Sequence, residues 1–238
     1  MGRIKRYRTA LSRHHRSRGF GIHSPFAFNF VRFVLREKSP YYCYDEMAEL
    51  RQAVVGSLRD VKNHPRVVSF KGLKMIFRIA NHFNPSCIMQ VGTSYGLTAV
   101  SLMNVSATSR LWLYEPHLDA YPVIGNVLAP FLDRIECYNQ LDVAAADYSK
   151  NLAEAYTFVV VNSIPASSDY EPLRLLLCNM LDGESVIVLR NLHRSNMMKQ
   201  LWLRLKDSMS HGQSFTNEKT AVIVSLKKIN LEHFFLWF

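Results

Sequence analysis

The stretch CIMQVGTSYGLTAVSLMNV, residues 87–105, decides the fold of this chain. It opens with a short apolar run typical of a buried strand and closes with an apolar segment of helical spacing. Gly92 and Gly96 lie in the turn between them. A dinucleotide-binding loop would place glycine at 92, 94 and 97, but Ser94 and Leu97 stand at the last two. The stretch therefore predicts a strand, a glycine turn of different spacing, and a helix.

The same alternation continues along the chain on the C-terminal side of this unit. The expected strands are residues 87–91, 111–115, 134–138, 157–161 and 185–189. The expected helices are residues 97–105, 142–155, 170–181 and 195–209, the last one capped by Ser195. Alternating strands and helices predict a parallel sheet that is covered by helices on both faces.

The C-terminal end of the chain breaks this alternation. Residues 214–217 and 220–226 are both strand-like and only a short turn separates them. Parallel neighbours need a crossover of a dozen or more residues, so these two strands must be antiparallel. A last apolar segment, HFFLWF at 233–238, closes the chain without an assigned strand. We expect an α/β, Rossmann-like, doubly wound sheet of seven strands with the last strand antiparallel.

Helices are also predicted before the sheet, where they would form an N-terminal helical lid. Ser24 followed by Pro25 is a good helix start, with Phe26, Phe30, Phe33 and Val34 on one face. Further helices are expected from about Asp45 and over 70–83, with a polar linker at 59–66. The resulting division is a basic flexible tail (1–19), an N-terminal helical segment (20–83) and the sheet domain (84–238).

Positive charge is concentrated at the N-terminus. The chain has 29 basic and 19 acidic residues, and residues 1–18 contain seven of the basic ones and no acid. Such a tail would contact nucleic acid or an anionic surface, or simply remain solvated; an organellar transit peptide is a third interpretation. The four cysteines are far apart, and no apolar run is long enough for a membrane span or a secretory signal. We therefore expect a cytoplasmic protein with no transmembrane segment.

The segment QVGTSYGLTAVSLM, the strand-ending YEP at 114–116 and the antiparallel final hairpin together resemble the class I S-adenosylmethionine-dependent methyltransferases. The likeness is closest to small O-methyltransferase-like proteins, and GIHSPF at 21–26 resembles an N-terminal helix of one bacterial branch. Glu115 ends the second strand, 23 residues after Gly92, where an acid can accept hydrogen bonds from ribose hydroxyls.

The resemblance implies a residue-by-residue assignment with S-adenosylmethionine as the cofactor. The implied cofactor-binding residues are Gly92, Thr93, Gly96, Glu115, Asn139 and Asp142. Asn162, at the end of the fourth strand, would face the transferred methyl group. The alternative for each is structural: the glycines permit a tight turn, and the polar residues are ordinary strand ends or turn residues.

The metal-dependent members of that group place acids after the fourth and fifth strands. Here the corresponding residues are Asn162 and then Arg190 with Asn191. Because Mg²⁺ prefers carboxylate oxygens, we expect no metal site and metal-independent activity. His193 follows closely and is a candidate general base, or else a histidine at a helix entry.

Two functions remain open at this stage. One is methyl transfer to an unidentified acceptor, which we expect to be a small molecule. The other is a catalytically inactive methyltransferase-fold protein that acts as a binding or interaction module, which the Asn162 and Arg190 replacements favour. A nucleic-acid methyltransferase lacks support because NSIP, at 162–165, stands where an Asn/Asp-Pro-Pro-aromatic motif would be needed. A homodimer is left open.

Overall fold

The computed structural model describes residues 21–62, 64, 66–92, 94–117, 122–152 and 156–238. Thr93 and the basic segment 1–19, both singled out above, lie outside the described residues.

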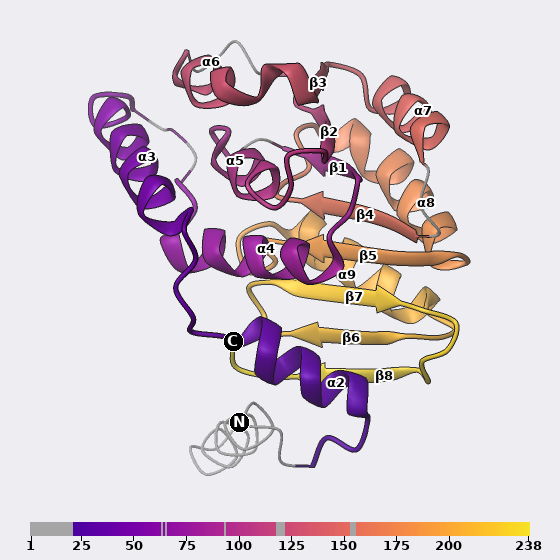
Figure 1. Ribbon diagram of the computed structural model, residues 1–238. Helices are drawn as coiled ribbons and strands as arrows, with labels where there is room; N and C mark the ends of the chain where they lie inside the picture. The colour runs from indigo at the N-terminus through magenta and orange to yellow at the C-terminus, as the bar shows by residue number, and fades with distance from the viewer. Residues whose placement is uncertain (1–20, 63, 65, 93, 118–121, 153–155) are drawn as a thin grey trace, which may run out of the picture.

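The central sheet has eight strands in the order β3-β2-β1-β4-β5-β7-β6-β8 (Figure 1). Their bounds are β1 Cys87–Val91, β2 Arg110–Tyr114, β3 Ile135–Tyr138, β4 Tyr156–Val161, β5 Glu184–Leu189, β6 Gln213–Thr216, β7 Ala221–Ser225 and β8 Glu232–Phe235. Strands β1 to β5 are mutually parallel, and β7 runs antiparallel to both β5 and β6. The Rossmann-like α/β fold is confirmed.

The strand count and the identity of the last strand were predicted wrongly. The apolar end of the chain forms β8, which pairs with β6 in parallel, so the antiparallel strand is the seventh of eight. Strand β7 runs antiparallel to β6 and so returns the chain to the edge of the sheet where β6 begins. The parallel pair of β6 and β8 therefore needs no helical crossover, because the short turn after β7 passes β6 and leads into β8. Stacking of Phe234 on Phe215, with 5.3 Å between ring centroids, stabilises this pairing.

Helices cover both faces of the sheet, as expected. Their bounds are α2 Pro25–Phe30, α3 Tyr44–Ser57, α4 Phe70–Phe83, α5 Leu97–Met103, α6 Val123–Leu128, α7 Leu141–Asn151, α8 Tyr170–Leu181 and α9 Asn196–Ser208. Helices α2 to α6 pack in one hydrophobic core with one face of the sheet, and α7 to α9 form a second core with the other face. No helix among the described residues is long and apolar enough to cross a membrane.

The N-terminal helices belong to the same core as the sheet. Phe30 of α2 lies 5.0 Å from Phe215 of β6, ring centroid to ring centroid, and Figure 1 shows α2 lying across β6 and β8. Ser24 caps α2 as predicted, and the helix continues as a π-helical turn, Val31–Leu35. Phe33, expected on the buried face, is 59% exposed because the wider π-helical turn shifts the side chains that follow it.

A buried arginine anchors this N-terminal segment to α4. Arg78 donates from Nε to the Val34 carbonyl at 2.8 Å and from Nη2 to the Leu35 carbonyl at 3.0 Å. These carbonyls end the π-helical turn and have no partner within it, so the guanidinium stabilises the helix end.

Candidate functional site

Four candidate residues lie in a row along one edge of the sheet. Gly92, Glu115, Asn162 and Arg190 each directly follow a strand, and the register pairs the last residues of β1, β2, β4 and β5 with one another. Backbone hydrogen bonds continue the ladder past the strand ends, from Gly92 N to the Tyr114 carbonyl and from Asn162 N to the Val91 carbonyl, each at 2.9 Å. This is the carboxyl edge of the parallel strands, where open α/β sheets bind their ligands.

The glycine loop holds an uncommon backbone conformation. Gly92 and Gly96 have φ of 77° and 80°, and the non-glycine residues Ser94 and Tyr95 have φ of 52° and 60°. A left-handed conformation disfavours a side-chain-bearing residue by about 1–2 kcal/mol. Such strain persists where the surrounding structure enforces it, and it concentrates at ligand sites.

Both glycines also satisfy close packing within the chain. A Cβ on Gly92 would overlap the Ser163 hydroxyl, and one on Gly96 would lie 2.8 Å from Val127 Cγ1 of α6. Tyr95 is buried, and its hydroxyl lies 3.5 Å from His64 Nδ1. The structure therefore shows a packing role for the two glycines. Their assignment to cofactor binding stays a prediction.

The remaining predicted cofactor ligands lie at the ends of β2 and β3. Glu115 is half-buried, and its Oε1 accepts from the His117 backbone N–H at 3.1 Å. Asn139 and Asp142 are exposed, and Asp142 lines a hollow of about 420 Å³ between Tyr138 and α7. Their roles stay predictions.

Asn162 is the centre of a buried polar network. Its Nδ2 donates to the Gly92 carbonyl at 2.7 Å, and its Oδ1 accepts from Arg190 Nη1 at 2.7 Å and from Thr98 Oγ1 at 3.2 Å. Asn191 Nδ2 donates to the Asn162 carbonyl at 2.9 Å. With 2% of its surface exposed, Asn162 fixes the glycine loop to β4 and β5. Its predicted catalytic role stays untested.

Arg190 carries a buried positive charge into this network. The residue is 7% exposed, and among the described residues no ion pair includes it. Burial, with a smaller contribution from the Arg194 charge, lowers the pKa of Arg190 to about 10. Its Nη2 lies 3.5 Å from where a Cβ on Gly72, in the first turn of α4, would stand. Within the described parts of the chain, no group of three or more His, Cys, Asp or Glu could hold a metal ion.

His193 is exposed and surrounded by cations. Arg194 Nε donates to His193 Nε2 at 3.3 Å, so that this ring nitrogen acts as an acceptor. Partial burial lowers the pKa of His193, and the charges of Arg194, Lys219 and Arg66 lower it further. A neutral imidazole at neutral pH suits a general base, although the Arg194 hydrogen bond must break before Nε2 can take a proton. The predicted role of His193 stays open.

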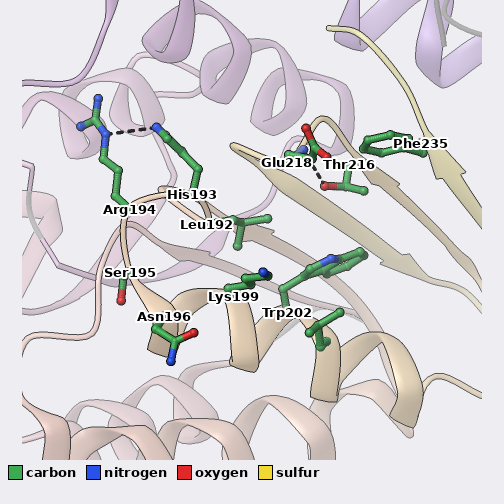
Figure 2. A pocket seen from close by; sticks show the side chains of 11 residues that line it. Leu192, His193, Arg194, Ser195, Asn196, Lys199, Trp202, Thr216, Glu218 and Phe235 are labelled. Atoms are coloured by element: carbon green, nitrogen blue, oxygen red, sulfur yellow. Dashed lines mark hydrogen bonds between the residues drawn. The ribbon is translucent and has the colours of Figure 1, made fainter. Parts of the chain in front are cut away.

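A pocket of about 580 Å³ opens beside His193, between α9 and the ends of β5, β6 and β8 (Figure 2). Its lining combines polar and charged residues with apolar ones: Leu192, His193, Arg194, Ser195, Asn196, Lys199, Trp202, Leu203, Thr216, Glu218 and Phe235. This volume is within the range of small-molecule sites.

Sequence reasoning identified His193 and missed most of the other pocket residues. Lys199 and Trp202 are three residues apart on α9, a spacing that indicates a shared helix face. That signal was available in the sequence. Phe235 and Glu218 offered none, because they reach the pocket only through the pairing of β8 with β6 and the turn after β6.

The fold is similar to solved O-methyltransferase structures, although the sequence itself matches no protein-family model and no curated protein. An O-methyltransferase from Bacillus cereus in complex with S-adenosylhomocysteine (SAH) is 15% identical, with a TM-score of 0.54 over 82% of this chain and 96% of that one. TomG from Streptomyces achromogenes, an O-methyltransferase involved in tomaymycin synthesis and solved with S-adenosylmethionine (SAM), is 14% identical, with a TM-score of 0.52 over 82% and 95%. A methyltransferase from Geobacter sulfurreducens is 12% identical, with a TM-score of 0.50 over 80% of this chain and 93% of that one. The expected fold, that of the class I methyltransferases, is thereby confirmed.

Proposed function

We propose that the protein is a methyltransferase that uses SAM to methylate a small-molecule acceptor. The observation that carries this proposal is the glycine loop, whose left-handed backbone at the end of β1 lies beside the end of β2, which Glu115 directly follows. On a class I methyltransferase fold this edge is where a nucleotide-like cofactor binds.

The residues present fit such a cofactor. Glu115 and the exposed Asp142 offer carboxylate oxygens to ribose hydroxyls and to the base. The side chain nearest to where a Cβ on Gly92 would stand is the exposed Ser163, whose hydroxyl moves away by rotation about χ1. The loop itself is held in advance, since the Gly92 carbonyl accepts from Gln90 Nε2 at 2.8 Å and from Asn162 Nδ2 at 2.7 Å.

When bound, SAM supplies an electrophilic methyl group on a sulfonium. The chain's own contribution is to position the acceptor in line with that methyl group, and proximity and orientation supply most of the rate. A base is needed only for an acceptor that must lose a proton, and His193 is the residue we assign to that role.

We further propose that the activity needs no divalent metal. A dication between the ends of β4 and β5 would meet the Arg190 guanidinium, which points into the Asn162 network. At an effective dielectric constant of about 20 and a separation of about 4 Å, this repulsion is roughly 8 kcal/mol. Turnover should therefore persist in EDTA. Activity that EDTA abolishes and Mg²⁺ restores would contradict the proposal.

Calorimetric titration with SAM and SAH tests cofactor binding directly. Glu115→Ala should weaken SAH binding by about ten- to a hundredfold, because hydrogen bonds to a carboxylate are each worth about 1.5–3 kcal/mol. Glu49→Ala removes an exposed carboxylate on α3 and is the matched control. Absence of SAH binding by the parent protein, or equal affinities for both variants, would refute the assignment.

The rival function is a non-catalytic binding module on the same fold. Asn162 favours it, because its side-chain oxygen and nitrogen are both engaged inside the protein and Ser163 covers Gly92. SAH binding without methylation of any acceptor in a screen would support the rival. The four free cysteines, on which we base a reducing cytoplasmic location, suit either function.

A further inference from the structure

The pocket between α9 and β8 differs from the glycine-loop region in its chemistry. Trp202 and Leu192 are almost fully buried, and the half-buried Phe235 and the exposed Leu203 add apolar surface. Figure 2 shows Trp202, Leu192 and Phe235 around the pocket. Large apolar side chains around an open pocket are suited to a flat apolar molecule.

Positive charge dominates the polar part of this pocket. Arg194 and Lys199 line it together with His193, and Glu218 is the single carboxylate among the lining residues. Both cations are exposed, and in the described part of the chain neither Arg194 nor Lys199 forms an ion pair.

More positive charge comes from neighbouring segments. Lys219, in the turn between β6 and β7, and Arg66, in the segment before α4, both act on His193 and lower its pKa, as Arg194 does. The pKa of Lys71 is also lowered, mainly by burial and then by cations that include Lys219. Like charges held this close oppose one another, and a bound anion would relieve that repulsion.

We propose that this pocket binds a small molecule with a flat apolar body and an anionic group, and that such an anion is the methyl acceptor. The second half of this statement rests on the proposed function, since the pocket opens at the same sheet edge as the glycine loop. The anionic group would lie at the cationic wall to which His193, Arg194 and Lys199 contribute, with the apolar body against Trp202 and Phe235.

Two fluorescent probes of the same shape separate charge from apolar contact. They are 8-anilinonaphthalene-1-sulfonate, an aromatic anion, and N-phenyl-1-naphthylamine, its neutral counterpart. The full-length protein, without SAM, should bind the sulfonate at least tenfold more tightly. Equal affinities, or tighter binding of the neutral probe, would overturn the proposal.

A matched pair of variants locates the site. Lys199→Met should weaken sulfonate binding about three- to tenfold and leave the neutral probe unaffected. Lys228→Met removes an exposed charge after β7, at the opposite edge of the sheet, and should leave both affinities unchanged. Equal thermal midpoints for the two variants verify folding. If both variants bind the sulfonate alike, the pocket assignment is wrong.

The pH dependence of sulfonate binding provides an independent readout. The sulfonate stays ionised between pH 5 and 8, and an anion beside His193 favours the imidazolium, so affinity should rise as the pH falls. His193→Gln should remove that rise. Arg194, Lys219, Arg66 and Glu218 are the other charged groups that face the same region. A pH dependence unchanged in His193→Gln would contradict the placement. SAH titration remains a separate test, so failure here leaves cofactor binding unaffected.

Discussion

Replacing Arg190 by methionine tests whether this buried charge serves the fold. The substitution keeps much of the side-chain length and removes the guanidinium from a site that is 7% exposed. Burial lowers the pKa of Arg190 to about 10, and this shift corresponds to roughly 3 kcal/mol by which the folded state disfavours the charged form.

The opposing contribution is the hydrogen bonding that the guanidinium makes. Nη1 donates to Asn162 Oδ1 at 2.7 Å and more weakly to Thr98 Oγ1 at 3.4 Å. Hydrogen bonds to a charged group contribute about 1.5–3 kcal/mol, and Thr98 still satisfies Asn162 Oδ1 after the substitution. The two effects nearly cancel. Arg190→Met should therefore keep its free energy of unfolding within about 1–2 kcal/mol of the parent.

Asn162→Ala is the informative comparison because it leaves the cation in place. The guanidinium loses its 2.7 Å acceptor and the Gly92 carbonyl loses one of its two donors, so the buried charge is poorly compensated. We expect a loss of about 3 kcal/mol or more. Urea unfolding followed by circular dichroism measures both variants, with the m-value checked for constancy. A loss above about 3 kcal/mol in Arg190→Met would refute the reasoning and make the guanidinium a structural element.

Three further predictions concern the backbone, the tail and protonation. Gly212→Ala should lower the free energy of unfolding by more than about 2 kcal/mol, because φ is 83° and the new Cβ would overlap the Val224 carbonyl. Gly125→Ala, whose new Cβ would stand in open space, is the control in the same assay. Deleting residues 1–18 should leave the thermal midpoint nearly unchanged, since the segment offers much charge and little to bury, and a drop of several degrees would show that it packs on the domain. Because the pKa of His193 is lower in the folded state than in the unfolded state, the stability that His193 contributes should be present above pH 6.5 and decrease as the pH falls below that value. If the free energy of unfolding has the same pH profile in the parent protein and in His193→Gln, this contribution is excluded.

Much of the fold follows from signals that act over a few residues. Ser24, Ser69 and Ser195 each accept a hydrogen bond from a backbone N–H three residues on, which fixes where α2, α4 and α9 begin. The apolar runs that form β1 to β5 and the short turn between β6 and β7 are equally local. Such features are written in the sequence because neighbouring residues alone decide them.

The site depends on contacts that no local pattern specifies. Arg190 reaches Thr98, 92 positions away, and the glycine at position 92 is shaped by Ser163 and Asn162 from the end of β4. A sequence pattern reports which residues are buried and how they are spaced, but partners so far apart are set by the order in which strands join the sheet. The same reason explains β8 and the pocket beside it. The sequence shows the apolar character of the last residues. Tertiary structure alone decides their pairing with β6, which brings Phe235 opposite Thr216.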